Sequence, residues 1–377
     1  MNKNRVNFKK VLIMAGAFAS YSIGSGFAAG QNEMQYFCSW GGIWPFVLSA
    51  LCLVMVAFYC AVTVDLAREE PFEKPSDAYE FYFGKALGKF LDAASFVIIS
   101  CVSLAMFAGC GATLNQYFGI PTFIGSLGLG IVALLIVWLG LEKLTNFLGY
   151  AGILIIVFIA IVGFYAAFLS DGSIMESQKN MLTYVAEGKF LQIIILGVKN
   201  PIVSGVFYGS AVLLPAFPFL VAISNKADNK KEAVYSGILS SVLYTLGLFL
   251  VIITLLKNLD YIAANGTEVP MLSAITNILP SISVPYMVVL VIAILTTATG
   301  FLWVVGRRFA DDRTAKQRII VGVICAIGII VGAFVPFSKL VNIIYPIEGM
   351  AGFVIFIGLI VNMIRKPHSK QAENAEK

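Results

Sequence analysis

Charged side chains are scarce in this sequence. Asp, Glu, Lys and Arg together make up 12% of the 377 residues, whereas hydrophobic residues make up 59%. A soluble globular domain carries about a quarter charged residues. The composition therefore predicts an all-α polytopic membrane protein, with the lipid bilayer as its surroundings. The net charge of +5 does not indicate nucleic-acid binding, because the basic residues are spread over separate segments between apolar runs.

Histidine and paired cysteines are also lacking. The only histidine, His368, lies in a polar C-terminal segment, which argues against a histidine-based metal site or proton relay. The six cysteines show no C-x-x-C spacing, and we expect them to pack as small apolar residues. No nucleophile–base pair, metal cluster or nucleotide motif is evident. We therefore expect no enzyme, no cofactor and no protein partner.

Long apolar runs are what the sequence does contain, and runs of about 20 apolar residues are typical of transmembrane helices. Ten spans are predicted, at 11–37, 44–64, 90–114, 123–140, 147–169, 201–224, 233–256, 284–306, 319–334 and 341–363. Most Lys and Arg residues fall on one side of these spans, together with both termini. The positive-inside rule then predicts a multi-pass protein with cytoplasmic termini, including a polar tail at 365–377.

The first span is interrupted by glycine near its middle. The stretch 20–37 reads SYSIGSGFAAGQNEMQYF, with Gly24, Ser25 and Gly26 close to the centre of the span. Unpaired backbone is tolerated at that depth only where protein or a water-filled cavity satisfies it. The glycines therefore indicate either close helix packing or an unwound ligand site.

The sixth span contains a second set of helix breakers: Gly205, Gly209, Pro215 and Pro218. It begins on the opposite side of the membrane from the first span. Two interrupted helices at corresponding positions of oppositely oriented halves are typical of a transporter with an inverted repeat. We therefore predict a single domain over 1–377, built from halves at 11–169 and 201–363, with helices 1 and 6 broken and facing each other.

Two groups of residues near these breaks suit a ligand and an ion. Amides at Gly24, Ser25 and Gly26 would begin a half-helix and could bind a carboxylate, which suits a zwitterion. On the eighth span, Ala293, Thr296 and Thr297 share one helix face. Two hydroxyls and a carbonyl without a carboxylate favour a monovalent ion such as sodium. The alternative is that both threonines bond carbonyls of their own helix.

Two acids lie within spans, Glu33 on the first and Glu348 on the tenth. Ionisable residues inside a membrane are functional by default, so both are candidates for proton coupling or gating. The alternative places them in an outer vestibule, bonded to backbone or water.

The chain resembles a known superfamily. Its five-plus-five plan and the IGSGF sequence at 23–27 resemble the amino acid–polyamine–organocation superfamily, which has the LeuT-type fold. The run GSGFAAGQNEMQYF is more narrowly similar to the YkvI family of bacterial membrane proteins, although Asn32 separates Gln31 from Glu33 here. The resemblance implies a location in a bacterial plasma membrane.

The resemblance also implies site residues. The substrate carboxylate would meet the backbone of Gly24, Ser25 and Gly26. The rest of the implied substrate pocket is Phe27, Phe207, Tyr208, Gly209 and Ser210. A sodium ion would be bound by the carbonyls of Ser20 and Ile23 and by Ala293, Thr296 and Thr297.

These observations support one leading hypothesis, a sodium-coupled secondary transporter of a small amino acid or related zwitterion that works by alternating access. Two alternatives stay open: a transporter-like receptor that binds its ligand without transporting it, and a proton-coupled transporter.

Overall fold

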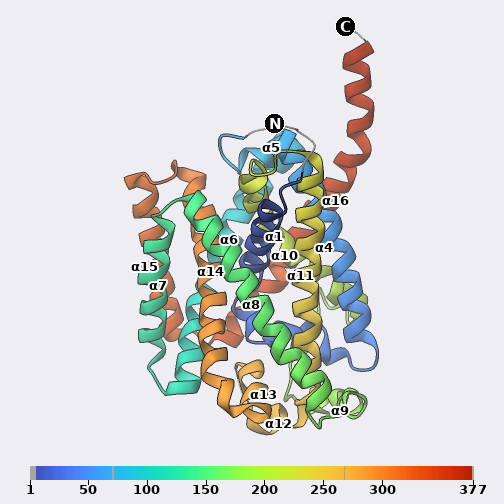
Figure 1. Cartoon of the computed structure of the whole chain (residues 1–377), viewed down its shortest axis with the longest axis vertical. Coiled ribbons are helices and arrows are strands. Elements are labelled where there is room, and N and C mark those ends of the chain that lie inside the picture. The colour runs from blue at the N-terminus through green and yellow to red at the C-terminus, as the bar shows by residue number, and fades with distance from the viewer. Residues whose placement is uncertain (1–5, 70–71, 267, 376–377) are drawn as a thin grey trace.

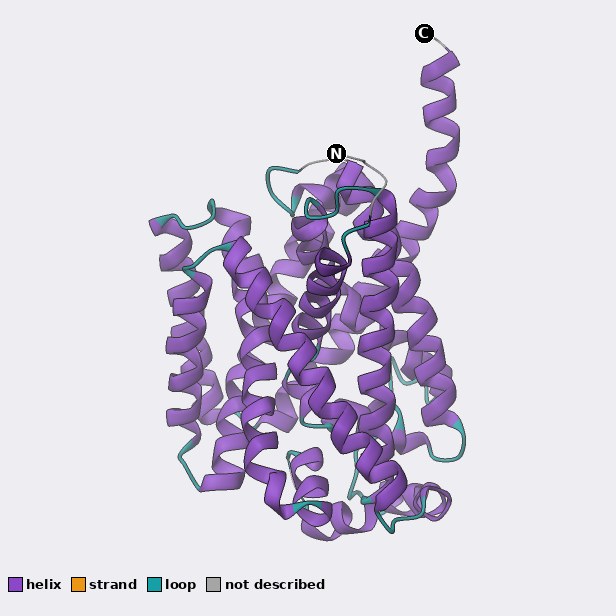
Figure 2. Ribbon diagram, viewed as in Figure 1, coloured by secondary structure: helices purple, strands orange, loops and turns teal. Residues whose placement is uncertain are grey.

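The computed structural model is a bundle of helices that run in both directions along one long axis (Figure 1). It describes the backbone of residues 6–69, 72–266 and 268–375. Within these ranges all regular secondary structure is helical, and Figure 2 shows only helices and loops. The predicted all-α class is confirmed.

The main helices follow the apolar runs. Their bounds are α1 Phe8–Ser22, α2 Ser25–Ala28, α3 Gln31–Tyr36, α4 Trp44–Glu69, α5 Asp77–Phe83, α6 Lys85–Phe118, α7 Thr122–Val137, α8 Leu141–Leu169, α9 Ile174–Ala186, α10 Pro201–Ser224, α11 Lys230–Lys257, α12 Leu259–Asn265, α13 Pro270–Ile278, α14 Ser283–Phe309, α15 Ala315–Phe334 and α16 Phe337–Ala375. Two short 3-10 helices lie at Cys38–Trp40 and Pro280–Ile282.

Eight of the described helices are long and apolar enough to cross a membrane: α4, α6, α8, α10, α11, α14, α15 and α16. The other two predicted spans correspond to the shorter apolar helix α7 and to the interrupted segment α1–α3. The beginning of α1, the helix α5 and the end of α16 lie at one end of the bundle, whereas α9, α12 and α13 lie at the other (Figure 1). Over 365–375 the predicted polar tail continues α16 as a helix.

The predicted interruption of the first span is present. Helix α1 ends at Ser22, and Ile23 and Gly24 lie outside any helix before α2 begins at Ser25. Gly30 then adopts a φ of 78°, a left-handed conformation that favours glycine, and turns the chain into α3.

The predicted interruption of the sixth span within 207–215 is wrong. Helix α10 is continuous from Pro201 to Ser224 and includes Pro215 and Pro218. Proline removes a backbone donor, so the carbonyls of Ala211 and Leu214, four residues before the two prolines, lose their helical partner. Membrane helices tolerate such a loss where neighbouring groups compensate for it. In the same turns the Tyr59 hydroxyl donates to the Leu213 carbonyl and the Tyr21 hydroxyl donates to the Pro215 carbonyl, both at 2.7 Å, which ties this part of α10 to α4 and α1.

Glycines bring two pairs of helices into backbone contact. Helix α1 packs along α8, where a Cβ atom added at Gly152 would overlap the carbonyl oxygen of Gly16. Helix α10 packs along α16, where a Cβ atom added at Gly352 would overlap the Ser210 carbonyl oxygen. Both contacts use a G-x-A-G sequence, GYAG at 149–152 and GMAG at 349–352. Small residues at helix interfaces are typical of membrane bundles.

Candidate functional site

The break between α1 and α2 borders a small internal cavity. Its lining comes from α1–α3, α6, α10, α11, α14 and α16, and it includes Gly24, Phe27, Tyr208, Thr297 and Glu348. The cavity volume is about 40 Å³. One water needs roughly 10–15 Å³, whereas a pocket for a drug-sized ligand measures about 300–1,000 Å³. This conformation is therefore closed around the centre of the molecule.

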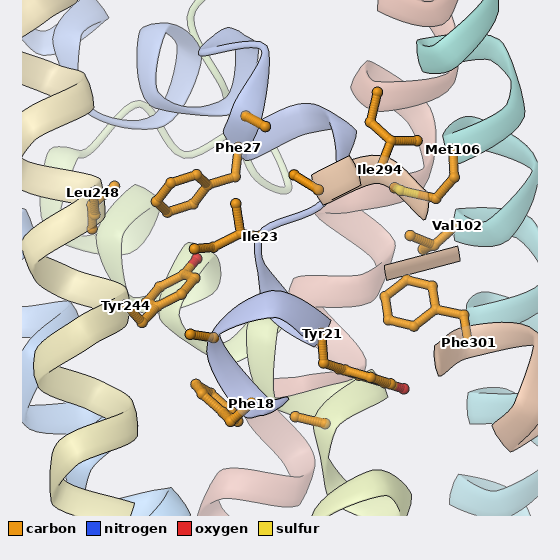
Figure 3. Close-up of a cluster of buried hydrophobic side chains, with 14 of the residues drawn as sticks. Phe18, Tyr21, Ile23, Phe27, Val102, Met106, Tyr244, Leu248, Ile294 and Phe301 are labelled. Atoms are coloured by element: carbon orange, nitrogen blue, oxygen red, sulfur yellow. The ribbon is translucent and has the colours of Figure 1, made fainter. Parts of the chain in front are cut away.

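Aromatic rings surround the break, as Figure 3 shows. The rings of Phe27 and Tyr244 lie on one side with centroids 5.1 Å apart. Tyr21 and Phe301 form an edge-to-face pair at 4.9 Å on the other side. The unwound residues Ile23 and Gly24 thus lie between two apolar walls.

The glycines at the break are closely packed. A Cβ atom at Gly24 would lie 3.2 Å from Met106 and Thr297 side-chain atoms, and one at Gly26 would collide with the Asn32 amide. The Ser25 amide points to the sulfur of Met106 at 3.4 Å. The glycines therefore permit close packing, and of these three residues only Gly24 lines the cavity. A ligand site at this break stays a prediction.

The predicted ion ligands converge on one carbonyl. Because α1 stops at Ser22, the carbonyls of its last turn lack helical partners. The Thr296 and Thr297 hydroxyls each donate to the Ser20 carbonyl oxygen at 3.0 Å. The Thr296 hydroxyl also lies 2.9 Å from the Ala293 carbonyl. The structure thus brings together Ser20, Ala293, Thr296 and Thr297, and Ile23 lies buried at the adjoining break.

Glu33 is fully buried in α3 and belongs to a hydroxyl chain. The Tyr208 hydroxyl donates to Glu33 Oε1 at 2.9 Å and lies 2.9 Å from the Tyr244 hydroxyl. Glu33 Oε2 is buried and has no hydrogen-bond partner among the described residues. The carboxyl is therefore deep in the protein rather than in an open vestibule.

Glu348 is buried in α16 and lines the cavity itself. Tyr345, one turn earlier, lines it too. Asn32 and Tyr36 complete this polar side, and their Oδ1 and hydroxyl atoms are buried without a partner among the described residues.

Three predicted pocket residues on α10 lie away from the cavity. Phe207 stacks on Phe353 of α16 with ring centroids 5.6 Å apart. A Cβ atom at Gly209 would meet Met55 of α4. The Ser210 hydroxyl donates to the carbonyl of Val206 in its own helix. Of the predicted α10 segment, only Tyr208 lines the cavity.

The sequence analysis missed several lining residues. Asn32 and Tyr36 lie inside the quoted glycine-rich stretch, and their i, i+4 spacing places them on one helix face. Tyr345 and Glu348 have an i, i+3 spacing that does the same in α16. Tyr244 carries no comparable signal, because nothing near it in the sequence separates it from an ordinary packing tyrosine. Within the described residues no cluster of His, Cys, Asp and Glu suits a metal ion.

Comparisons with known proteins identify the fold. No protein-family model matches the chain, and no curated protein matches it in sequence. Among solved structures, it resembles the substrate-bound, outward-open state of a Na+-coupled sialic acid symporter, with a TM-score of 0.59 and 13% identity over 88% of this chain and 72% of that chain. A mutant of the Eremococcus coleocola manganese transporter aligns with a TM-score of 0.49 and 15% identity, over 98% and 74% of the two chains. The chain therefore has the fold of the symporter.

Proposed function

We propose that ten helical segments cross the membrane as two five-helix halves in an inverted repeat. The contact of α1 with α8 in the first half has a counterpart in the contact of α10 with α16 in the second. Both use G-x-A-G sequences at the fifth helix. Aligning these contacts pairs Gly16 with Ser210, and Gly24 then corresponds to Pro218. In this alignment a helix-breaking residue therefore stands at the same place in both halves. The chain is interrupted at Gly24, whereas α10 continues through Pro218. This plan is that of the LeuT-type fold of the amino acid–polyamine–organocation superfamily.

The function that this arrangement supports best is sodium-coupled secondary transport of a small amino acid or related zwitterion by alternating access. One observation carries the proposal: the carbonyl freed by the α1 break meets two threonine hydroxyls of α14 beside a buried polar cavity. An ion at this point would connect α1 to α14. Its binding would therefore depend on the relative position of these helices, which is what coupling requires.

The residues at the break fit a sodium ion. Sodium is a hard cation that prefers oxygen ligands, and the Ser20 and Ala293 carbonyls and the Thr296 and Thr297 hydroxyls supply them. Each hydroxyl can rotate and present a lone pair in place of its proton. Ile23 would complete the set through its backbone carbonyl.

The substrate would occupy the cavity after it opens. A carboxylate would meet the backbone of Gly24, Ser25 and Gly26. Phe27 and Tyr208 would contact the rest of the molecule. The surrounding bilayer is proposed to be a cell membrane, with both termini in the cytoplasm.

Two other functions would use the same region differently. A receptor that binds without transport would have no need for an ion site between α1 and α14. Coupling to protons instead of sodium would use Glu33 or Glu348, which are both buried.

The test is the thermal stability of the purified protein against a panel of amino acids, with sodium or with choline as the salt. A ligand that binds the native state raises the apparent melting temperature by mass action. We expect sodium to stabilise the protein and to strengthen the effect of at least one amino acid. Equal stabilisation in sodium and choline would contradict sodium coupling.

A further inference from the structure

The carboxyl group of Glu348 faces the cavity without a basic partner. The residue is 3% exposed, and no Lys or Arg is among the described residues that line the cavity. A buried charge without a counter-charge is costly, so buried carboxylates are normally paired. Glu348 is the only carboxylate on the described lining. The cavity therefore has an acceptor for a positive charge and lacks a side chain that supplies one.

The repeat shows that packing alone does not require this carboxyl. Glu348 precedes GMAG in α16, and the residue in the same place before GYAG in α8 is Leu148. Leu148 is fully buried. In the first half, the glycine contact of the fifth helix therefore forms with a leucine, not a carboxyl, at this position. The carboxyl of Glu348 is therefore not needed for the glycine contact between α16 and α10, and we look for its role in the cavity.

Two other polar residues of the cavity also offer oxygen atoms that can accept hydrogen bonds. The cavity brings it together with Asn32 and Tyr36, whose Oδ1 and hydroxyl atoms are buried without a partner among the described residues. A carboxylate oxygen, an amide oxygen and a phenol oxygen can all accept hydrogen bonds. An ammonium group has three N–H donors and a positive charge. The number of its donors and the sign of its charge match this set of three acceptors.

We propose that Glu348 determines substrate specificity by binding an ammonium group of the substrate together with Asn32 and Tyr36. The cavity then requires a free ammonium group and rejects analogues whose amine is acylated. This inference rests on the proposed transport function and adds the residues that recognise the ammonium group of the substrate. Glu33 has a different role, because its carboxyl is held by Tyr208 and is absent from the described lining.

The experiment uses probes that differ in charge and little in size. Purified full-length protein in sodium is titrated by thermal shift with alaninamide, alanine and N-acetylalanine, and with the same three derivatives of leucine. At neutral pH these carry net charges of about +1, 0 and −1, since only the amine and carboxyl groups change. We expect the amino acids and their amides to bind, because both keep the ammonium group, and the amino acids to bind more tightly, because only they offer the carboxylate. We expect no binding of the acetylated compounds.

Glu348→Gln keeps the shape of the side chain and removes its charge. We expect it to weaken binding of the amide probes about 10- to 100-fold, the loss typical of a hydrogen bond to a charged group. Glu348→Asp should recover part of the affinity. Glu348→Leu reproduces the residue of the first half and should fold with a normal melting temperature while losing the probe response. Glu176→Gln, at the exposed helix α9, removes the same charge and should leave binding unchanged.

The outcomes separate this inference from the proposed function. Unchanged binding of the amino acid and amide probes in Glu348→Gln would overturn the inference and leave sodium-coupled transport standing. If sodium stabilises the wild type and none of the six compounds does, the ammonium site is likewise wrong and the ion site stands. If neither sodium nor any compound has an effect, both the function and the inference fail.

Discussion

At the scale of single residues, the carbonyl of Ser20 connects the two chemical features of the site. It is free because α1 ends two residues later, and it accepts from both Thr296 and Thr297. Thr297 bonds across to α1 in place of a carbonyl in its own helix. The local alternative for this threonine is therefore not what the structure shows. Its role as a sodium ligand stays a prediction.

Replacing both threonines tests that role. In Thr296→Ala/Thr297→Ala two oxygen ligands are lost, at about 1–3 kcal/mol each. Sodium affinity should fall roughly tenfold for each hydroxyl. Because binding of sodium and substrate is linked reciprocally, the sodium enhancement of substrate binding should fade as well. The measurement is sodium-dependent thermal stabilisation.

Thr296→Ser is the matched control, since it keeps the hydroxyl and should change sodium affinity only slightly. Equal sodium dependence in the wild type, the serine variant and the double alanine variant would remove the threonines from the ion site.

The sequence predicted these threonines as ion ligands, because their spacing places both hydroxyls on one helix face and the lack of a nearby carboxylate favours a monovalent ion. It predicted the polar side of the cavity only in part. Glu33 and Glu348 stand out as acids within apolar runs, whereas Tyr244 and Tyr345 are two of 15 tyrosines. Which tyrosines meet at a cavity depends on the packing of distant helices, and a single sequence does not contain that information in readable form.

At the scale of elements, the two interrupted spans show what a local pattern can predict. Helix α1 ends at Ser22, Ile23 and Gly24 lie outside any helix, and the predicted break near Gly24 is confirmed. Pro215 and Pro218 do not interrupt α10, whose turns there are held by hydroxyls from α1 and α4. The effect of a proline therefore depends on its neighbours.

The glycine contacts between helices give a prediction at this scale. Gly152→Ala and Gly352→Ala each place a methyl group against a backbone carbonyl of the partner helix. Backbone cannot move aside as a flexible side chain does, so we expect a loss of about 1–3 kcal/mol in stability. Thermal unfolding of the purified variants provides the measurement.

Gly128→Ala in α7 is the control, because an added Cβ atom there meets nothing within 4 Å. It should be neutral or slightly stabilising, since alanine favours a helix by about 1 kcal/mol relative to glycine. If all three variants unfolded at the same temperature, the two G-x-A-G sequences would not be packing contacts.

At the scale of the whole molecule, hydrophobic runs were enough to predict the class and the approximate positions of the spans. The eight long helices coincide with predicted spans. The relation between the halves was predicted from the breakers in the first and sixth spans and stays a proposal, which now rests on the GYAG and GMAG contacts. That signal was present in the sequence, but two four-residue matches acquire meaning only when both are seen at equivalent interfaces.

The central claim is that this molecule moves its substrate at the expense of a sodium gradient. The direct measurement is uptake of the radiolabelled compound that stabilises the protein best, in proteoliposomes with sodium outside and choline inside. The account predicts transient accumulation above the external concentration. It also predicts that accumulation disappears when sodium is equal on both sides, and in Thr296→Ala/Thr297→Ala. Binding of the same compound without any uptake along the gradient would contradict the account and identify a receptor.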